Sequence, residues 1–87
     1  MLFTLGQIVA TPGALSLEER GVNLLTYLHR HLSGDWGDLD EEDKTENDFS
    51  VKNGFRILSA YTTQHGRLWI ITEADRSATT FLLPEEY

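Results

Sequence analysis

The sequence predicts an α+β domain: two or three N-terminal helices packed on one face of a three-stranded antiparallel β-meander, with an extra N-terminal strand as an option. Leucines recur at helical spacing in the first half of the chain, and short apolar runs rich in β-branched residues, separated by turn residues, fill the second half. Helices followed by strands are typical of the α+β class. With 87 residues, the chain is expected to form one domain, residues 1–87.

The N-terminal segment predicts a short strand or extended arm over residues 4–10. Leu5, Ile8 and Val9 supply its apolar positions, and the sequence Thr-Pro-Gly at residues 11–13 interrupts it. Proline is favoured at the first position of a helix, because the N–H group that it lacks needs no partner there. A short first helix is therefore expected over residues 14–20, closed by Gly21.

Residues 22–32 predict an amphipathic helix, whose apolar positions at helical spacing are Leu24, Leu25, Leu28 and Leu32. Asn23 can cap its start, and Gly34 suits a left-handed residue beyond its end. His29 and His31 fall in the last turn, two residues apart, which is not the i, i+4 spacing of a helical zinc site. We expect them in capping or ordinary surface positions, and His65 in a hairpin turn.

A third helix is predicted to begin after Asp40, which can serve as its N-cap, and to end at residues 53–54, Asn-Gly. Acidic side chains in its first turn face the positive end of the helix dipole. Its apolar content is essentially Phe49 and Val51, so most of this helix is expected to face water.

The second half of the chain predicts three strands, over residues 55–63, 67–73 and 77–83. The turns between them are short, which indicates neighbouring antiparallel strands. The middle strand carries a continuous apolar run at residues 68–71 and is expected at the centre of the sheet. The predicted core of the domain is Leu24, Leu28, Leu32, Ile57, Leu68, Ile70 and Leu82.

All of the net charge lies in one window, residues 35–48. This window holds eight acidic residues and a single base, Lys44, which gives it a charge of −7, the formal net charge of the whole chain. A field so localised steers association with charged partners and excludes nucleic acid from that surface. The eight acids are Asp35, Asp38, Asp40, Glu41, Glu42, Asp43, Glu46 and Asp48.

The acidic window has three interpretations. A calcium loop needs oxygen ligands at alternating positions around a central glycine, whereas Trp36 and Leu39 interrupt the acids here and the run continues into a helix, so no metal site is expected. A favourably charged helix start is the simplest interpretation. The third is an array of carboxylates that imitates a phosphate backbone or pairs with lysine and arginine side chains of a partner.

Trp36 stands between glycines and aspartates, and a tryptophan in such a loop is either a lid over a small core or an anchor for a partner. The lid is the favoured interpretation, because a small domain has few other ways to close its core.

Motifs for catalysis and cofactors are missing. The sequence has no GxSxG elbow, no GxGxxG loop and no P-loop, so a non-enzymatic protein without a cofactor is expected. It has no cysteine, no positively charged start before an apolar run and no apolar stretch of membrane-spanning length, which favours a cytoplasmic protein.

Three stretches, LGQIVATPGAL, SGDWGDLDEED and WIITEADRSATTFLLPEEY, cover about half of the chain. They resemble a family of small acidic proteins from bacteria and mobile elements, whose members are often labelled type I restriction M subunits. That label does not fit these residues, because a methyltransferase needs a glycine-rich cofactor loop and a base-flipping motif after a proline pair. The resemblance implies plasmid-like and phage-like genomes, in which small acidic proteins are often inhibitors of host defence, such as anti-CRISPR and antirestriction proteins.

The expected function is therefore that of a non-enzymatic acidic inhibitor, acting as a DNA mimic on a basic nucleic-acid-binding surface of a defence complex, as a monomer or homodimer. The alternatives are a small enzyme or metal-dependent regulator that uses the carboxylates of residues 35–42, and an accessory protein that dimerises through an exposed sheet edge. The expected partner-binding residues are Asp35, Trp36, Asp38, Asp40, Glu41, Glu42, Glu46 and Asp48.

Overall fold

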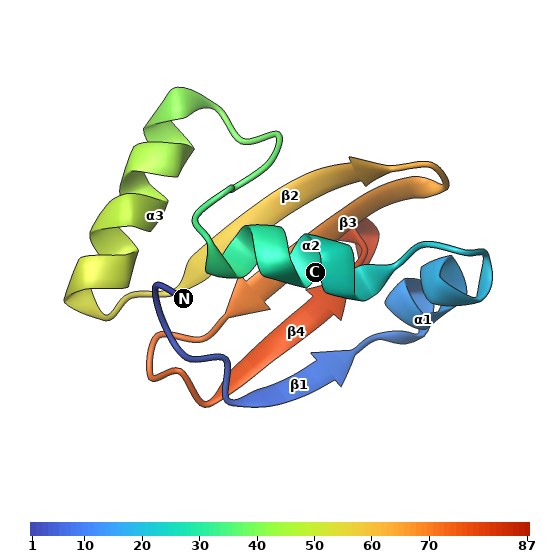
Figure 1. The fold of residues 1–87 in the computed structure, drawn as a ribbon, viewed down its shortest axis with the longest axis horizontal. Coiled ribbons are helices and arrows are strands. Elements are labelled where there is room, and N and C mark those ends of the chain that lie inside the picture. The colour runs from blue at the N-terminus through green and yellow to red at the C-terminus, as the bar shows by residue number, and fades with distance from the viewer.

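A four-stranded mixed β-sheet with three helices makes up the computed structural model, which describes residues 1–87 (Figure 1). The α+β class is confirmed. In chain order the elements are β1 (Gln7–Ala10), α1 (Pro12–Glu19), α2 (Leu24–Leu32), α3 (Glu41–Asn53), β2 (Ile57–Thr63), β3 (Gly66–Thr72), β4 (Ala78–Leu82) and a 3₁₀ turn, η1 (Pro84–Glu86). No helix combines the length and the apolar content that crossing a membrane would require.

The predicted caps Asn23 and Asp40 accept hydrogen bonds from backbone N–H groups in the first turns of α2 and α3. The first helix begins at Pro12, two residues before its expected start, and the side chain of Thr11 caps it in the same way. Each such cap stabilises its helix by about 1 kcal/mol. Gly54 adopts a left-handed conformation, with φ of 74°, directly after α3. The helix boundaries are therefore set locally by the sequence.

The sheet has the order β1-β4-β3-β2, so the predicted meander is present as β2, β3 and β4. The optional N-terminal strand is also present, and β1 pairs in parallel with β4, from Gln7 opposite Ala78 to Ala10 opposite Phe81. The sheet is therefore mixed. Gly6 has a φ of 63°, and a Cβ atom there would lie 2.4 Å from the backbone of Ser77, so this close entry into the sheet requires glycine.

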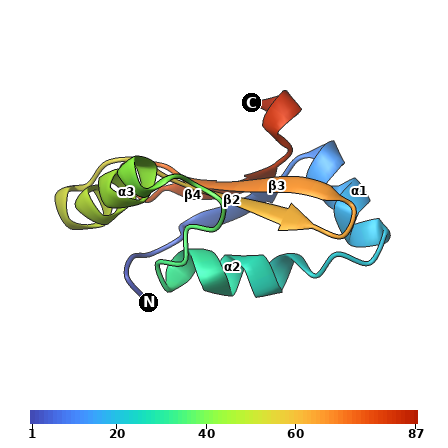
Figure 2. The same ribbon diagram turned by 90° about the horizontal axis from the view of Figure 1, so that it is seen from above.

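The sequence predicted that all the helices pack on one face of the sheet. The structure differs from this prediction. Figure 2 shows α2 below the sheet, α1 at one end of it and α3 at its side. The reason is the composition of α3, whose only buried residues are the polar Asn47 and Ser50. A helix without an apolar stripe has nothing to bury against a sheet face, and α3 packs beside β2 instead.

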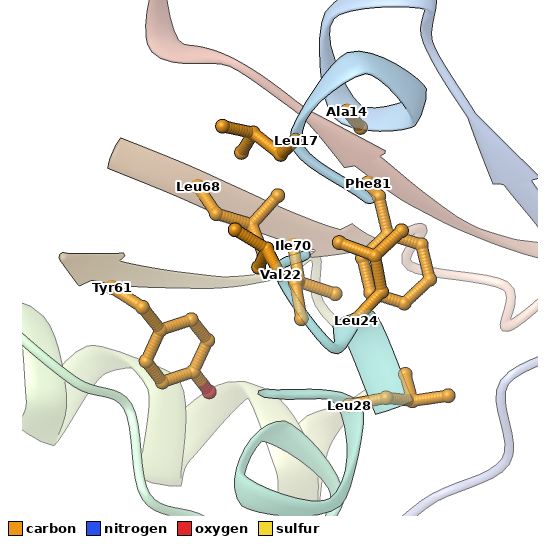
Figure 3. Packing of buried hydrophobic residues seen from close by; sticks show 9 residues of the cluster. All are labelled: Ala14, Leu17, Val22, Leu24, Leu28, Tyr61, Leu68, Ile70 and Phe81. Carbon is orange, nitrogen blue, oxygen red and sulfur yellow. The ribbon is translucent and has the colours of Figure 1, made fainter. Parts of the chain in front are cut away.

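The main core lies between α1, α2 and one face of the sheet (Figure 3). Its buried members are Ala14, Leu17, Val22, Leu24, Leu28, Tyr61, Leu68, Ile70 and Phe81. A smaller cluster of Phe3, Trp36 and Ile57 continues it toward α3. Of the seven predicted core residues only Leu32 is not fully buried. Each large apolar side chain taken fully out of water stabilises the fold by about 1.5–3 kcal/mol.

His31 is completely buried, so its expected place in a surface or capping position is wrong. It projects from α2 toward the sheet, where Nδ1 lies 2.5 Å from Ser59 Oγ on β2 and Nε2 lies 2.9 Å from Thr72 Oγ1 on β3. Phe3 and Trp36 pack against the ring edge to face. Helical spacing cannot reveal this role, because the hydroxyl partners come from distant strands.

The hydroxyl partners determine the tautomer of His31. Thr79 donates its hydroxyl proton to the carbonyl of Leu5, and Thr72 lies 2.7 Å from Thr79, so Thr72 must donate to Thr79. Thr72 then accepts a hydrogen bond from Nε2–H of His31, and Ser59 donates to Nδ1. With this neutral imidazole both ring nitrogens and all three hydroxyl groups have partners. Burial in this site lowers the pKa of His31 from 6.5 to about 4.

This pKa predicts how stability depends on pH. Because the unfolded chain binds a proton at His31 near pH 6.5 and the folded protein only near pH 4, the contribution is complete above pH 6.5 and is lost as the pH falls toward 4. The expected loss in the free energy of unfolding between pH 7 and pH 4.5 is about 2 kcal/mol. Denaturant titrations at pH 7 and pH 4.5 measure it, with His29→Gln as the matched control.

The exposed control His29→Gln should keep the full decrease, whereas His31→Gln should show a clearly smaller one. An equal decrease in both variants would contradict the assignment of this titration to His31.

Candidate functional site

The acidic segment, residues 35–48, is attached to the outer edge of β2 by backbone hydrogen bonds. Ala60 donates its N–H to the carbonyl of Trp36 at 3.2 Å, and the N–H of Asp38 donates to the carbonyl of Ala60 at 2.7 Å. Between them Gly37 forms a parallel bridge to Ala60, and a Cβ atom at Gly37 would lie 2.0 Å from the Ala60 oxygen. Only glycine permits this approach. The segment therefore satisfies an edge that would otherwise be open to other strands.

Asn47, on the side of α3 that faces the sheet, supplies further hydrogen-bond partners to the edge of β2. Its amide nitrogen donates to the carbonyl of Leu58 at 2.6 Å, and its amide oxygen accepts from the N–H of Leu58 at 3.2 Å. One side chain thus replaces a pair of backbone partners along β2. This arrangement fixes the face that α3 turns toward the sheet, and hence the face that it turns to solvent.

Trp36 is 3% exposed and belongs to the smaller core cluster. Its indole Nε1 donates to Asp48 of α3 at 2.9 Å, and its ring stacks on Phe3. The tryptophan is therefore a lid over the core, as the favoured interpretation predicts. Although the sequence also places Trp36 among the partner-binding residues, this position leaves almost none of its surface for a partner.

Arg76, in the turn between β3 and β4, holds the other end of α3. Its guanidinium group donates to the carbonyls of Ser50 and Phe55, at 3.0 and 2.8 Å, and to two carbonyls of its own turn. Arginine at the C-terminal end of a helix satisfies carbonyl groups that have no partner within the helix. Arg76 itself has a φ of 62°, which directs it from the β3–β4 turn toward α3.

Four of the eight acids are bound within the fold. Asp35 pairs with Arg30 at 2.7 Å, and this hydrogen bond holds the pKa of the Asp35 carboxyl below its usual value. Asp38 accepts from the hydroxyl of Thr62 at 2.8 Å. Asp40 is the N-cap of α3, and Asp48 accepts from Trp36. Removing any of these four would therefore alter the fold as well as the charge.

The other four acids form the acidic face, which we define as Glu41, Glu42, Asp43 and Glu46. All four are exposed. Glu41 lies 3.7 Å from Lys44, which is a weak surface pair. The carboxylates of Glu42, Asp43 and Glu46 have no hydrogen-bond or ion-pair partner in the chain. The partner-binding residues expected from the sequence include Glu41, Glu42 and Glu46 but not Asp43.

Two exposed aromatic rings adjoin the acidic face. Phe49 of α3 and Phe55, which precedes β2, are 57% and 53% exposed, and their rings stack with centroids 5.7 Å apart. They line a shallow hollow of about 630 Å³ together with Thr45, Glu46, Ser50 and Arg56. A second hollow of about 260 Å³ adjoins it and includes Asp43 and Glu46. The sequence placed Phe55 in a strand and did not indicate this surface.

The structure provides no ligand set for a metal ion. The acids of the loop diverge: Asp35 turns toward Arg30, Asp38 toward β2 and Asp40 toward the start of α3. No group of three or more histidine, aspartate or glutamate residues could hold a metal ion. The proposed metal role of residues 35–42 therefore gains no support from this geometry.

Comparisons of the chain with protein-family models, with curated proteins and with solved structures find no match. A function is therefore argued from the residues of this chain.

The attachment of α3 predicts a specific loss of stability in Asn47→Ala. This change leaves the N–H and the carbonyl of Leu58 without partners, and an unpaired, partly buried backbone group costs about 1–3 kcal/mol. The matched control is Asn53→Ala, because the exposed Asn53 amide bonds only to Phe49 of its own helix. Chemical denaturation should show a large loss for the first variant and a loss below about 0.5 kcal/mol for the second. Equal losses would mean that Asn47 does not hold α3 to the sheet.

Proposed function

We propose that this chain is a non-enzymatic binding protein whose acidic face occupies a basic, nucleic-acid-binding surface of another protein. The observation that carries the proposal is that Glu42, Asp43 and Glu46 are exposed on one helix and serve no bond of the fold. Carboxylates without an internal partner are available to lysine and arginine side chains of a second protein.

The density of charge on α3 resembles that of a nucleic-acid strand. Residues 41–46 span about 9 Å of helix and carry four carboxylates and Lys44, a net charge of −3. This is roughly one charge per 3 Å, and one strand of DNA presents one phosphate per about 3.4 Å along its axis. A surface of arginines and lysines spaced for phosphates would therefore meet a similar spacing of carboxylates.

The rest of the chain carries no net charge. Outside residues 35–48, six acids balance six bases, so the net charge of the chain is that of the acidic window. Long-range attraction of this kind raises the association rate with a basic partner, most strongly at low salt. The same field repels nucleic acid, which argues against a direct nucleic-acid ligand.

Phe49 and Phe55 offer apolar contact area, which the charged side chains of the acidic face do not provide. Protein interfaces concentrate their binding energy in aromatic residues near the centre, while exposed rim charges add specificity and speed. The stacked pair of rings stands directly beside Glu46. An arginine of the partner could lay its planar guanidinium against a ring while its charge meets the carboxylate.

The resemblance to proteins of mobile elements is our reason for proposing a defence complex as the partner that carries the basic surface. A defence complex of a bacterial host, such as a CRISPR or restriction complex, binds nucleic acid in the cytoplasm and presents such a surface. This assignment rests on class analogy.

A triple variant tests the proposal. Glu42→Gln, Asp43→Asn and Glu46→Gln together remove three charges that form no hydrogen bond or ion pair within the fold, so binding to the partner should weaken at least tenfold. The chain should still fold, with a loss of stability of about 0.3–1 kcal/mol for each of the first-turn acids Glu42 and Asp43. The matched control is Glu18→Gln, Glu19→Gln and Glu85→Gln, which alters three exposed acids elsewhere. Both variants change the net charge from −7 to −4.

The measurement uses capture from host lysate to identify proteins that wild type and control retain and the acidic-face variant loses. Each one, once purified, is tested for displacement of labelled DNA by this chain. Equal retention by both triple variants, or retained proteins that keep their DNA, would contradict the proposal.

A further inference from the structure

The two edges of the sheet differ. The β2 edge is closed at Leu58 by Asn47 and at Ala60 by the backbone of residues 36–38, whereas β1 borders only β4. The N–H groups of Gln7 and Thr11 bond to Ser77 and Phe81 on the β4 side. Because backbone groups alternate along a strand, Ile8 and Ala10 direct their N–H and carbonyl groups outward.

The β1 strand itself is largely apolar and carries no charged side chain. Ile8 and Val9 are 51% and 41% exposed. No charged side chain occurs in residues 1–17, so the edge lacks the charges that usually prevent pairing. Beside it lies a groove of about 210 Å³, which has seven apolar residues and Glu18 in its wall and is bordered by the exposed Leu15 and Leu25.

We propose that a second copy of this chain pairs with β1 in antiparallel orientation, joining two sheets into one of eight strands. The outward N–H and carbonyl groups of Ile8 then pair with those of Ala10 in the second copy. Those of Ala10 pair with Ile8 of the second copy, which gives four hydrogen bonds in total. The two-fold axis passes between the two Val9 residues. Registers displaced along the strand use fewer groups, because Gly6 has a positive φ and Pro12 has no N–H.

The distribution of charge favours a second copy as the occupant. The acidic α3 lies at the opposite edge from β1 (Figure 1), so a β1 to β1 dimer places the two helices at its far ends. Seven strand spacings separate the two β2 strands, about 33 Å. This exceeds the Debye length of about 8 Å at physiological ionic strength, so repulsion between the copies is small. A symmetric pairing also needs only one strand sequence, which each copy supplies.

A single-cysteine variant tests the pairing and its register. The chain has no cysteine, so Val9→Cys carries the only thiol. A non-hydrogen-bonded antiparallel pair has Cα atoms about 4.5 Å apart, at the short end of the range of about 4.4–6.8 Å in which a disulfide forms. Mild oxidation should crosslink most of this variant into dimers. Leu2→Cys is the matched control, since Leu2 is 51% exposed and lies outside β1, and it should remain largely uncrosslinked.

Sedimentation equilibrium of the unmodified protein gives an independent result. It should show a concentration-dependent mass approaching twice the 9.9 kDa of one chain. Ile8→Lys, with Leu2→Lys as its control, should return the mass to that of one chain while circular dichroism stays unchanged. A single-chain mass for the wild type up to about 1 mM would overturn the proposal, even if a strand of another protein paired with β1. Equal crosslinking of the two cysteine variants would overturn the register.

Discussion

The rest of the structure depends on the closure of one sheet edge. The outer side of β2 has backbone groups that need partners, and the acidic segment supplies them through the backbone of residues 36–38 and the amide of Asn47. Since a helix with so few apolar residues cannot hold itself to a sheet by hydrophobic contact, these polar bonds take that role. They decide which side of α3 faces the protein and which side faces water.

This closure divides the acidic residues into two groups. Asp40 and Asp48 belong to the attachment of α3, as a cap and as the acceptor for Trp36, so their charges are already engaged. Glu42, Asp43 and Glu46 are exposed and keep their carboxylates for a partner. The same asymmetry leaves β1 as the edge without cover. The two proposed contacts therefore occupy opposite edges of one sheet and do not compete.

Local structure could be predicted from the sequence because its causes are local. Capping residues, a left-handed glycine after α3 and alternation in the strands each act within a few positions, and they place most boundaries within two residues. Contacts between distant segments could not be predicted in this way. The parallel pairing of β1 with β4, the position of α3 beside the sheet and the burial of His31 all depend on residues far apart in the chain.

The candidate site shows the same limit. Its net charge and most of its acids were evident in the sequence, but the division into engaged and unengaged carboxylates required the partners Arg30, Thr62 and Trp36. Phe55 could not be assigned to the site, because only the return of the chain from α3 to β2 brings it against Phe49.

Amide hydrogen exchange, followed residue by residue, tests the difference between the two edges most directly. Leu58 and Ala60 donate to the acidic segment, so their N–H groups should be strongly protected at every protein concentration. Those of Ile8 and Ala10 should exchange fast in dilute solution and slow down as the concentration rises. Fast exchange at Leu58 and Ala60 would show that the β2 edge is open, and it would contradict the fixed position of α3 on which the acidic face depends.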